Sequence, residues 1–500
     1  MMFSACGGSD TTSPGTLAIA VIGESAPGLD EGYLFEGFAT EYGMGASGQV
    51  IFQGSANVKN GGPRERKTAM WYGPPGALKV IAEVGQPMPG AKDDNRIGDF
   101  SLLPRIVTRN GTAVFVVRVA KQLPGYQPEA LVAHRDGVLE KIVANGDPVP
   151  VPDGEGRLLN ISQYVAVDDG VLIMGTFARR KTAFWYWDFS KLRLVVAEGT
   201  EMPVGEFDCK IRSLESTTMD MNTEGLALFR ASMFGNNCRY GGIVGWDRQS
   251  DRLLAIALNR TPIQDGSSLY FQSTTGDARV SDGGHIALHA GIFDSDGSPG
   301  AMDSTLWQPD AGGDSQILID KQAQLPDAPE LKLTHAIHDS GMAPSNRNEL
   351  LHFVRNHHDR IILRTRIDTS PVHQVVAHTG TTVDDSTSAR IGTGHLNRNG
   401  EVVFVSYVDD GRRGGSYQQE LWLSQRDAPL QAIARRGDVI VGRDTDTIER
   451  IEFYNQSHEP RMFSTQGGRM RQISDDGAVL FAGRLQTGTR RPNALFVTRF

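Results

Sequence analysis

Histidines gather in one stretch of this chain. Seven of its twelve histidines fall between His335 and His378. Converging imidazoles suit two chemistries, a transition-metal site or the base and charge-neutralising groups of a lyase that abstracts a proton beside a uronate carboxyl. If the protein is an enzyme, such a polysaccharide lyase is the reading we favour. Its candidate catalytic residues are then His335, His338, His357 and His358.

Strand geometry limits what these histidines can share. Residues three apart on a strand point to opposite faces of the sheet, and each residue advances the chain by about 3.3 Å. His335 and His338 can therefore share a metal ion only if their segment is irregular. We expect ordinary surface and packing histidines here, with the catalytic or metal site as the alternative.

A second polar group is the acidic segment Asp294-Ser-Asp296-Gly297, followed by Asp303. Carboxylates at this spacing resemble the ligands of calcium loops, but the glutamate expected at the twelfth position is missing. The favoured reading is a solvated acidic turn and a protein without a cofactor, and bound calcium or a transition metal is the alternative. The sequence also lacks a Gly-x-Ser-x-Gly elbow, a phosphate-binding Walker loop, a dinucleotide glycine fingerprint and a His-Glu-x-x-His motif.

Any such site must be carried by a repeated scaffold. One motif, Asn/Asp-x-x-Gly followed by alternating apolar residues, recurs every 52 to 77 residues. A turn residue at positive φ that opens into a period-2 pattern predicts a hairpin leading into a half-buried strand. The turns are centred on Gly48, Gly111, Gly170, Gly225, Gly284, Asn348, Gly400 and Gly477.

Two further motifs follow each of these turns. The first is an apolar and aromatic strand that contains all six tryptophans, such as Trp71 and Trp422. Exposed in series, these rings would form a sugar-stacking platform, but at a fixed place in each repeat we expect them in the core. The second is a strand that ends in a Gly/Pro turn, present in seven copies after the eight turns. The strand and turn Leu17–Gly28 supply the eighth copy.

Four strands per repeat predict an all-β fold, a single β-propeller of four-stranded antiparallel blades. We expect eight blades, with seven as the alternative. We also expect the protein to be a monomer. The domain would span residues 16–500, and segment 16–28 would complete the last blade together with residues 446–500. A repeat that is split between the two ends of a chain favours a closed ring over an open array.

The repeat Asn-x-x-Gly-x-Val-x-Phe, with the later Gly-Asp-x-Pro-x-Pro, resembles the tandem-repeat propeller proteins that many bacteria export. The likeness covers nearly the whole chain and is clearest around Gly48, Gly111 and Gly400. The repeat around Asn348 departs most, with Asn in place of Gly and His352 at the large apolar position. The resemblance implies the propeller fold and export, and it supplies no catalytic residues.

The N-terminal residues Phe3-Ser4-Ala5-Cys6-Gly7 resemble the cleavage box of bacterial lipoproteins. That resemblance implies a lipid on Cys6, residues 1–15 as a tether, and a place in the bacterial envelope, as an outer-membrane or periplasmic lipoprotein, or secretion. Only five residues precede the cysteine, where a signal peptide needs charged and apolar regions. The other reading is a disordered tail with an incidental thiol.

Charge and hydropathy restrict the partners. The net charge of −9 provides no basic field for a phosphate backbone, so we expect no nucleic acid. No run of eighteen apolar residues occurs, so membrane contact would come only through the lipid.

The antiparallel blade sorts its loops onto two faces. The connections between blades and those between the second and third strands share one face, and the latter vary widely in length, which favours that face for binding. Cys209 and Cys238 both fall at this end of the fourth repeat, and with an exported address we predict a disulfide between them. We expect a non-catalytic propeller that binds a protein or a glycan on this face, the lyase being the alternative.

Overall fold

The chain is built almost entirely of β-strands. The computed structural model describes residues 15–90, 95–120, 128–204, 207–235, 238–273, 278–294, 304–319, 325, 342–344, 348–356, 359–367, 371–409, 417–426, 428–452 and 473–500. The helical elements in these ranges are two short 3-10 turns, η1 (Pro63–Glu65) and η2 (Ala178–Arg180). Within the same ranges, no helix has the length and apolar character needed to cross a membrane.

The strands form sheets of four or five, which we number from 1 to 8 along the chain, and one two-stranded hairpin. Sheet 1 holds β2 (Tyr33–Met44), β3 (Val50–Val58), β4 (Lys67–Gly73) and β5 (Lys79–Glu83). Sheet 2 holds β6 (Ile97–Phe100), β7 (Ile106–Val107), β8 (Ala113–Val119), β9 (Glu129–Arg135) and β10 (Val138–Ala144). The hairpin β11 (Pro148–Val151) and β12 (Gly154–Arg157) follows. Sheet 3 holds β13 (Asn160–Val167), β14 (Gly170–Phe177), β15 (Lys181–Trp187) and β16 (Leu192–Ala197). Sheet 4 holds β17 (Glu201–Val204), β18 (Phe207–Met221), β19 (Leu226–Gly235), β20 (Cys238–Asp247) and β21 (Arg252–Leu258).

The second half of the chain continues the pattern. Sheet 5 holds β22 (Leu269–Ser273), β23 (Ala278–Val280), β24 (Ile286–Asp294), β25 (Ser304–Gln308) and β26 (Gln316–Ile319). Sheet 6 holds β27 (Met342–Pro344), β28 (Glu349–Asn356), β29 (Asp359–Arg366) and β30 (Val372–His378). Sheet 7 holds β31 (Thr382–Val383), β32 (Ser386–Leu396), β33 (Val402–Asp409), β34 (Tyr417–Ser424) and β35 (Gln431–Ala434). Sheet 8 holds β36 (Val439–Ile440), β37 (Arg443–Glu452), β38 (Ala478–Gln486), β39 (Asn493–Arg499) and β1 (Thr16–Val21).

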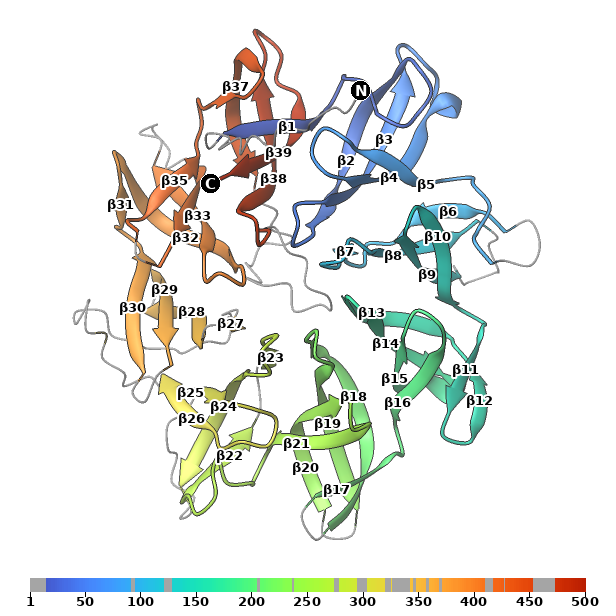
Figure 1. Ribbon diagram of the computed structural model, residues 1–500, viewed down its shortest axis with the longest axis vertical. Coiled ribbons are helices and arrows are strands. Elements are labelled where there is room, and N and C mark those ends of the chain that lie inside the picture. The colour runs from blue at the N-terminus through green and yellow to red at the C-terminus, as the bar shows by residue number, and fades with distance from the viewer. Residues whose placement is uncertain are drawn as a thin grey trace, which may run out of the picture.

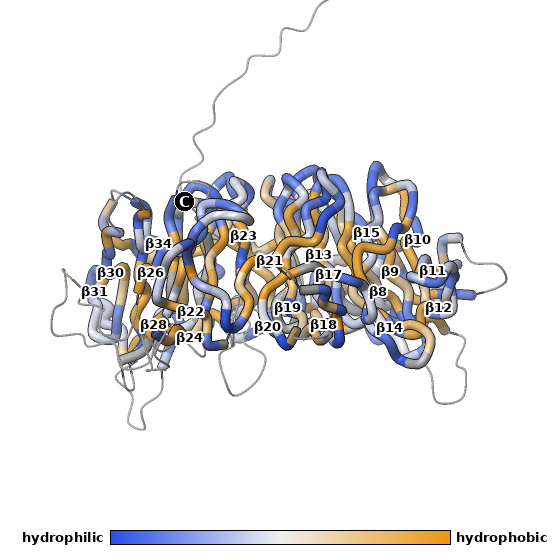
Figure 2. The backbone as a smooth tube through the Cα atoms, turned by 90° about the horizontal axis from the view of Figure 1, so that it is seen from below, coloured by the Kyte–Doolittle hydropathy of each residue, from blue (hydrophilic) through white to orange (hydrophobic). Residues whose placement is uncertain are grey.

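The sheets are arranged in a ring, the β-propeller arrangement that the repeats predict (Figure 1). Strands β7, β13, β23 and β27 lie near the centre of the ring, and we call such a strand the innermost strand of its sheet (Figure 1). In side view the middle of the ring is hydrophobic and the turns at both ends are hydrophilic (Figure 2). This distribution follows from the alternating pattern, since each sheet buries its apolar side chains against its neighbours and leaves the turns to water.

The N-terminal strand completes the last sheet. β1 runs antiparallel to β39, with Thr16 opposite Thr498 and Val21 opposite Ala494. It also pairs in parallel with β36 at Thr16 and Ile440, and β36 pairs with β37, so sheet 8 closes on itself. This is the pairing that the split repeat predicts, and the two strands lie side by side in Figure 1.

The tryptophans are core residues and form no binding platform. All six are buried, including Trp71, Trp185 and Trp422, each at most 1% exposed. Trp71 stacks on Phe52 of the neighbouring strand at a ring separation of 5.7 Å, and its indole N–H donates to the carbonyl oxygen of Pro27. The sugar-stacking alternative is therefore wrong for these rings, because their faces are covered by other side chains.

The repeated turns adopt the predicted left-handed backbone at seven of their eight positions. Gly400 has φ of 82°, and Asn348, the departure from glycine, has φ of 53°. Asparagine adopts left-handed backbone angles more readily than most non-glycine residues, so the turn can form at Asn348 without glycine. Gly170 is the exception, since its φ is not positive.

The innermost strands of several sheets are broken by irregularities that the period-2 pattern does not reveal. Register shifts occur between Phe38 and Tyr42 of β2 and between Glu215 and Asp220 of β18, and sheets 2 and 5 split this strand in two. In the break of sheet 2, the buried Arg105 donates to Glu41 of sheet 1, with its Nη1 2.8 Å from the Glu41 carbonyl oxygen and 3.3 Å from Oε2. Burial lowers the pKa of Arg105, and the Glu41 charge opposes this effect. This pair links two neighbouring sheets and is a structural contact.

Candidate binding site

The predicted histidine site falls outside the described residues. His335, His338, His357 and His358 are all beyond the described ranges, as are Cys6, Asp296 and Asp303. Asp294 is described at the end of β24, where it accepts a 3.4 Å hydrogen bond from Ser268. In the part of the chain that the structure describes, no three His, Cys, Asp or Glu side chains are grouped for a metal ion. The catalytic and metal hypotheses for these residues stay predictions.

The neighbouring histidines of sheet 6 have packing roles. The His373 Nδ1 lies 2.9 Å from Thr365 Oγ1 on the next strand, and burial lowers the pKa of His373. The His378 Nδ1 lies 2.6 Å from the carbonyl oxygen of Thr379. Both belong to β30, the last strand of its sheet. These two histidines therefore agree with the interpretation of the cluster as surface and packing residues.

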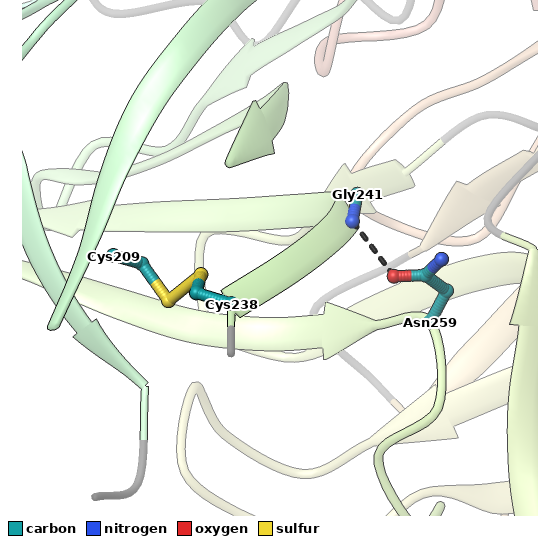
Figure 3. Close-up of a disulfide and its surroundings, with 4 residues drawn as sticks. All are labelled: Cys209, Cys238, Gly241 and Asn259. Atoms are coloured by element: carbon teal, nitrogen blue, oxygen red, sulfur yellow. Dashed lines mark hydrogen bonds between the residues drawn. A yellow bond between two sulfur atoms is a disulfide. The ribbon is translucent and has the colours of Figure 1, made fainter. Parts of the chain in front are cut away.

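The predicted disulfide is confirmed. Cys209 of β18 and Cys238 of β20 are bonded, with Cα atoms 5.7 Å apart and both side chains buried (Figure 3). The bond ties the start of β18 to the hairpin that joins β19 and β20. The stem of that hairpin is also held from its other side, because the Gly241 N–H donates to Asn259 Oδ1 at 2.7 Å (Figure 3).

A pocket opens at the end of this stapled hairpin. Its volume is about 630 Å³, and its lining comprises Arg212, Phe234, Gly235, Cys238 and Arg239. This size lies within the range of small-ligand sites. All five residues lie at the end of sheet 4 where β18 begins and the β19–β20 hairpin turns, which is the face that the loop lengths favour for binding.

Strand register sets the chemistry of the pocket. Phe234 lies opposite Lys210 on one neighbouring strand and opposite Arg239 on the other, so the three side chains share one face of the sheet. Phe234 is 50% exposed, so its ring is open to a ligand. An aromatic ring with basic side chains beside it forms an amphipathic surface that can contact an apolar face and a negative charge together.

The sequence reasoning identified this hairpin only as one of several variable loops. Two patterns in the sequence mark it: Cys209-Lys210-Ile211-Arg212 alternates apolar and basic residues, and Phe234 and Arg239 flank the turn at equal distances from its middle. Neither pattern is informative until the disulfide and the register place the two segments together.

The turns at the opposite end of the sheets carry a second charged group. The residue at the second position of the repeated turn is charged in five sheets, in the order Arg109, Asp168, Asp282, Arg398 and Asp475. Arg109 pairs with Asp168 at 3.7 Å and with Asp282 at 3.5 Å. Arg398 pairs with the same Asp282 and, at 3.7 Å, with Asp475. These alternating charges connect turns from five sheets and already satisfy one another, so this group is structural.

The turn charges give one prediction about stability. Replacing Asp282 by Asn should lower the free energy of unfolding by about 1–3 kcal/mol, because a largely buried carboxylate loses its charged hydrogen bonds to two arginines. The matched change Asp136→Asn should have almost no effect. The Asp136 side chain is 93% exposed, and its ion pair with Arg135 is long, at 3.9 Å. Urea unfolding measures both, and equal midpoints for the two variants would contradict the structural role.

The chain belongs to a family of unknown function, DUF7453, whose model matches residues 7–175 and 178–499. No curated protein matches the sequence. The family assignment therefore adds no activity.

Solved structures that resemble the chain include a propeller domain and two lyases. The β-propeller domain of the Trilobed protease from Pyrococcus furiosus is 9% identical with a TM-score of 0.35, over 81% of this chain and 97% of that one. An oligogalacturonate lyase from Vibrio parahaemolyticus is 10% identical with a TM-score of 0.36, over 90% and 97%. A PL25 ulvan lyase is 9% identical with a TM-score of 0.35, over 84% and 97%. At these scores the likenesses carry no argument about function.

Proposed function

We propose that this protein is a non-catalytic, exported propeller that binds a protein or glycan ligand on the face where the β19–β20 hairpin ends. A lipid on Cys6 would tether it to the bacterial envelope. In this proposal each of the eight sheets of four or five strands is one blade, and β1 closes the ring as the outermost strand of the last blade.

The observation that carries the binding proposal is the pocket at the stapled hairpin of sheet 4. A disulfide beside the turn of a hairpin holds the pocket wall in one conformation, which lowers the conformational entropy lost on binding. The exposed ring of Phe234 supplies an apolar contact at the centre of that wall. Because β1 begins opposite Thr498, at the end of β39 away from the β38–β39 hairpin, a tether attached before it leaves the sheet 4 face open to ligands.

The proposal is tested by replacing Phe234 with Ala and measuring binding to an immobilised panel of neutral and acidic oligosaccharides and peptides. Loss of a central aromatic contact should weaken capture of any bound ligand by about tenfold or more. The control is Val138→Ala, because Val138 is also exposed, at 64%, but lies at the start of β10, at the opposite end of its sheet. Equal losses for the two variants would overturn the site.

Incubation with the same panel also tests the alternative that the protein is a polysaccharide lyase. A lyase produces unsaturated sugars from uronate polymers, so their appearance would replace the binding proposal with a catalytic one. Fractionation of the native host tests the tether separately, since the proposal requires the protein in the membrane fraction.

A further inference from the structure

Two arginines of the sheet 4 pocket form no ion pair with the residues that the structure describes. Arg212 and Arg239 are both exposed and line the pocket on either side of Phe234. Among the residues that the structure describes, neither guanidinium has a carboxylate or carbonyl partner. Their neighbour Lys210 is paired, with Nζ 3.3 Å from Glu201. Two unpaired cations in one pocket are notable in a chain with a net charge of −9.

We propose that this pocket binds an acidic glycan through a uronate residue, with the carboxylate on Arg212 and Arg239 and the sugar ring on Phe234. The inference rests on the proposed binding function and adds the class of ligand. A planar guanidinium matches a carboxylate with two parallel hydrogen bonds, which are stronger than hydrogen bonds between neutral groups. The apolar C–H face of a pyranose fits the exposed aromatic ring.

The shape of the site favours a sugar over an acidic peptide. A peptide commonly binds an open sheet edge by adding a strand, and its main chain then supplies the affinity. Beside this pocket β19 lies between β18 and β20, and β20 pairs with β21 from Gly242 to Asp247, so the open edge of β20 at the pocket is only a few residues long. Recognition here must come from side chains, and a volume of about 630 Å³ suits one or a few sugar rings.

The proposal is tested with short oligomers of mannuronate, guluronate, galacturonate and glucuronate, each compared with its carboxyl-reduced neutral counterpart by calorimetry. The full chain should bind at least one acidic oligomer about 10–100-fold more tightly than its neutral form. Arg212→Gln and Arg239→Gln should each remove most of this preference. Phe234→Ala should weaken the acidic and the neutral forms by the same factor, because the ring contacts the sugar and not the carboxylate.

The matched control is Arg252→Gln. Arg252 is an exposed arginine of the same sheet, opposite Asp247 at the far end of β20 and β21, so its loss should leave the preference unchanged. A loss equal to that of Arg239→Gln would show a general charge effect and overturn the pocket. An oligoglutamate peptide of the same charge should bind more weakly than the oligosaccharide, and equal binding would also overturn the glycan proposal.

The two proposals fail in different ways. If neutral and acidic oligomers bind equally and only Phe234→Ala weakens them, the pocket binds glycans but the uronate inference is wrong. If no oligomer binds and the panel also shows no ligand that depends on Phe234, both proposals are wrong. Thermal unfolding of each variant, expected to match that of the wild type because all four side chains are exposed, separates loss of binding from loss of fold.

Discussion

Truncation of residues 1–22 should destabilise the whole protein by more than about 3 kcal/mol and broaden its unfolding transition. The deletion removes β1, which buries Val21 in the core between sheets 7 and 8 and Ala20 in the core between sheets 8 and 1. Burial of one valine side chain is worth about 1.5–3 kcal/mol, and each lost backbone hydrogen bond adds about 0.5–1.5 kcal/mol. The deletion also exposes the edge of β39, which makes the shortened protein prone to edge pairing and aggregation.

Truncation of residues 1–14 is the matched control, since it stops just before β1 and should leave the urea midpoint unchanged. A synthetic peptide covering residues 15–28 should restore cooperative unfolding to the longer truncation, because it can pair with β39 and refill the Val21 site. Chevron or equilibrium urea data with the same midpoint for both truncations would show that β1 does not hold the ring closed.

Removal of the disulfide should lower the free energy of unfolding by about 3–4 kcal/mol, as estimated for a closed loop of this length. The two cysteines are 29 residues apart, and the bond restricts the unfolded chain between them. The double change Cys209→Ser and Cys238→Ser removes the bond without changing the loop. Denaturant unfolding of the oxidised wild type and the double variant gives the difference directly.

Reductant provides the control for this second prediction. Dithiothreitol should shift the wild type toward the stability of the double variant and leave the double variant itself unchanged. Peptide mapping without reductant should recover the two segments as one linked species. Finding both thiols free would overturn the bond, and an unchanged stability in the double variant would limit its role to holding the pocket wall.

The repeat explains how much of the ring was predictable. Alternating apolar residues and turn glycines are local features, so the chain itself reveals where strands begin and that the last repeat lacks its fourth strand. That count placed the segment from Thr16 next to the C-terminal strand, and β1 does pair with β39. The same reasoning put Cys209 and Cys238 at one end of one sheet, where they are bonded.

The binding site was less accessible to such reasoning. The histidine stretch can be seen in the sequence because it is a matter of composition, whereas the pocket depends on which strands are neighbours and in which register. A one-residue change of register would turn Phe234 away from Lys210 and Arg239. The alternating residues around Cys209 were visible, but their meaning came from the hairpin that the disulfide brings beside them.

The sequence by itself therefore determined the class of fold, the closure by the N-terminal strand and the cysteine pairing, because each follows from local periodicity and from the order of antiparallel strands. Only the tertiary structure decided which side chains meet between sheets. The clearest case is Arg398 and Asp282, which are 116 residues apart and form an ion pair. Their contact depends on how the successive sheets are placed around the ring. The sequence of one repeat does not contain this information.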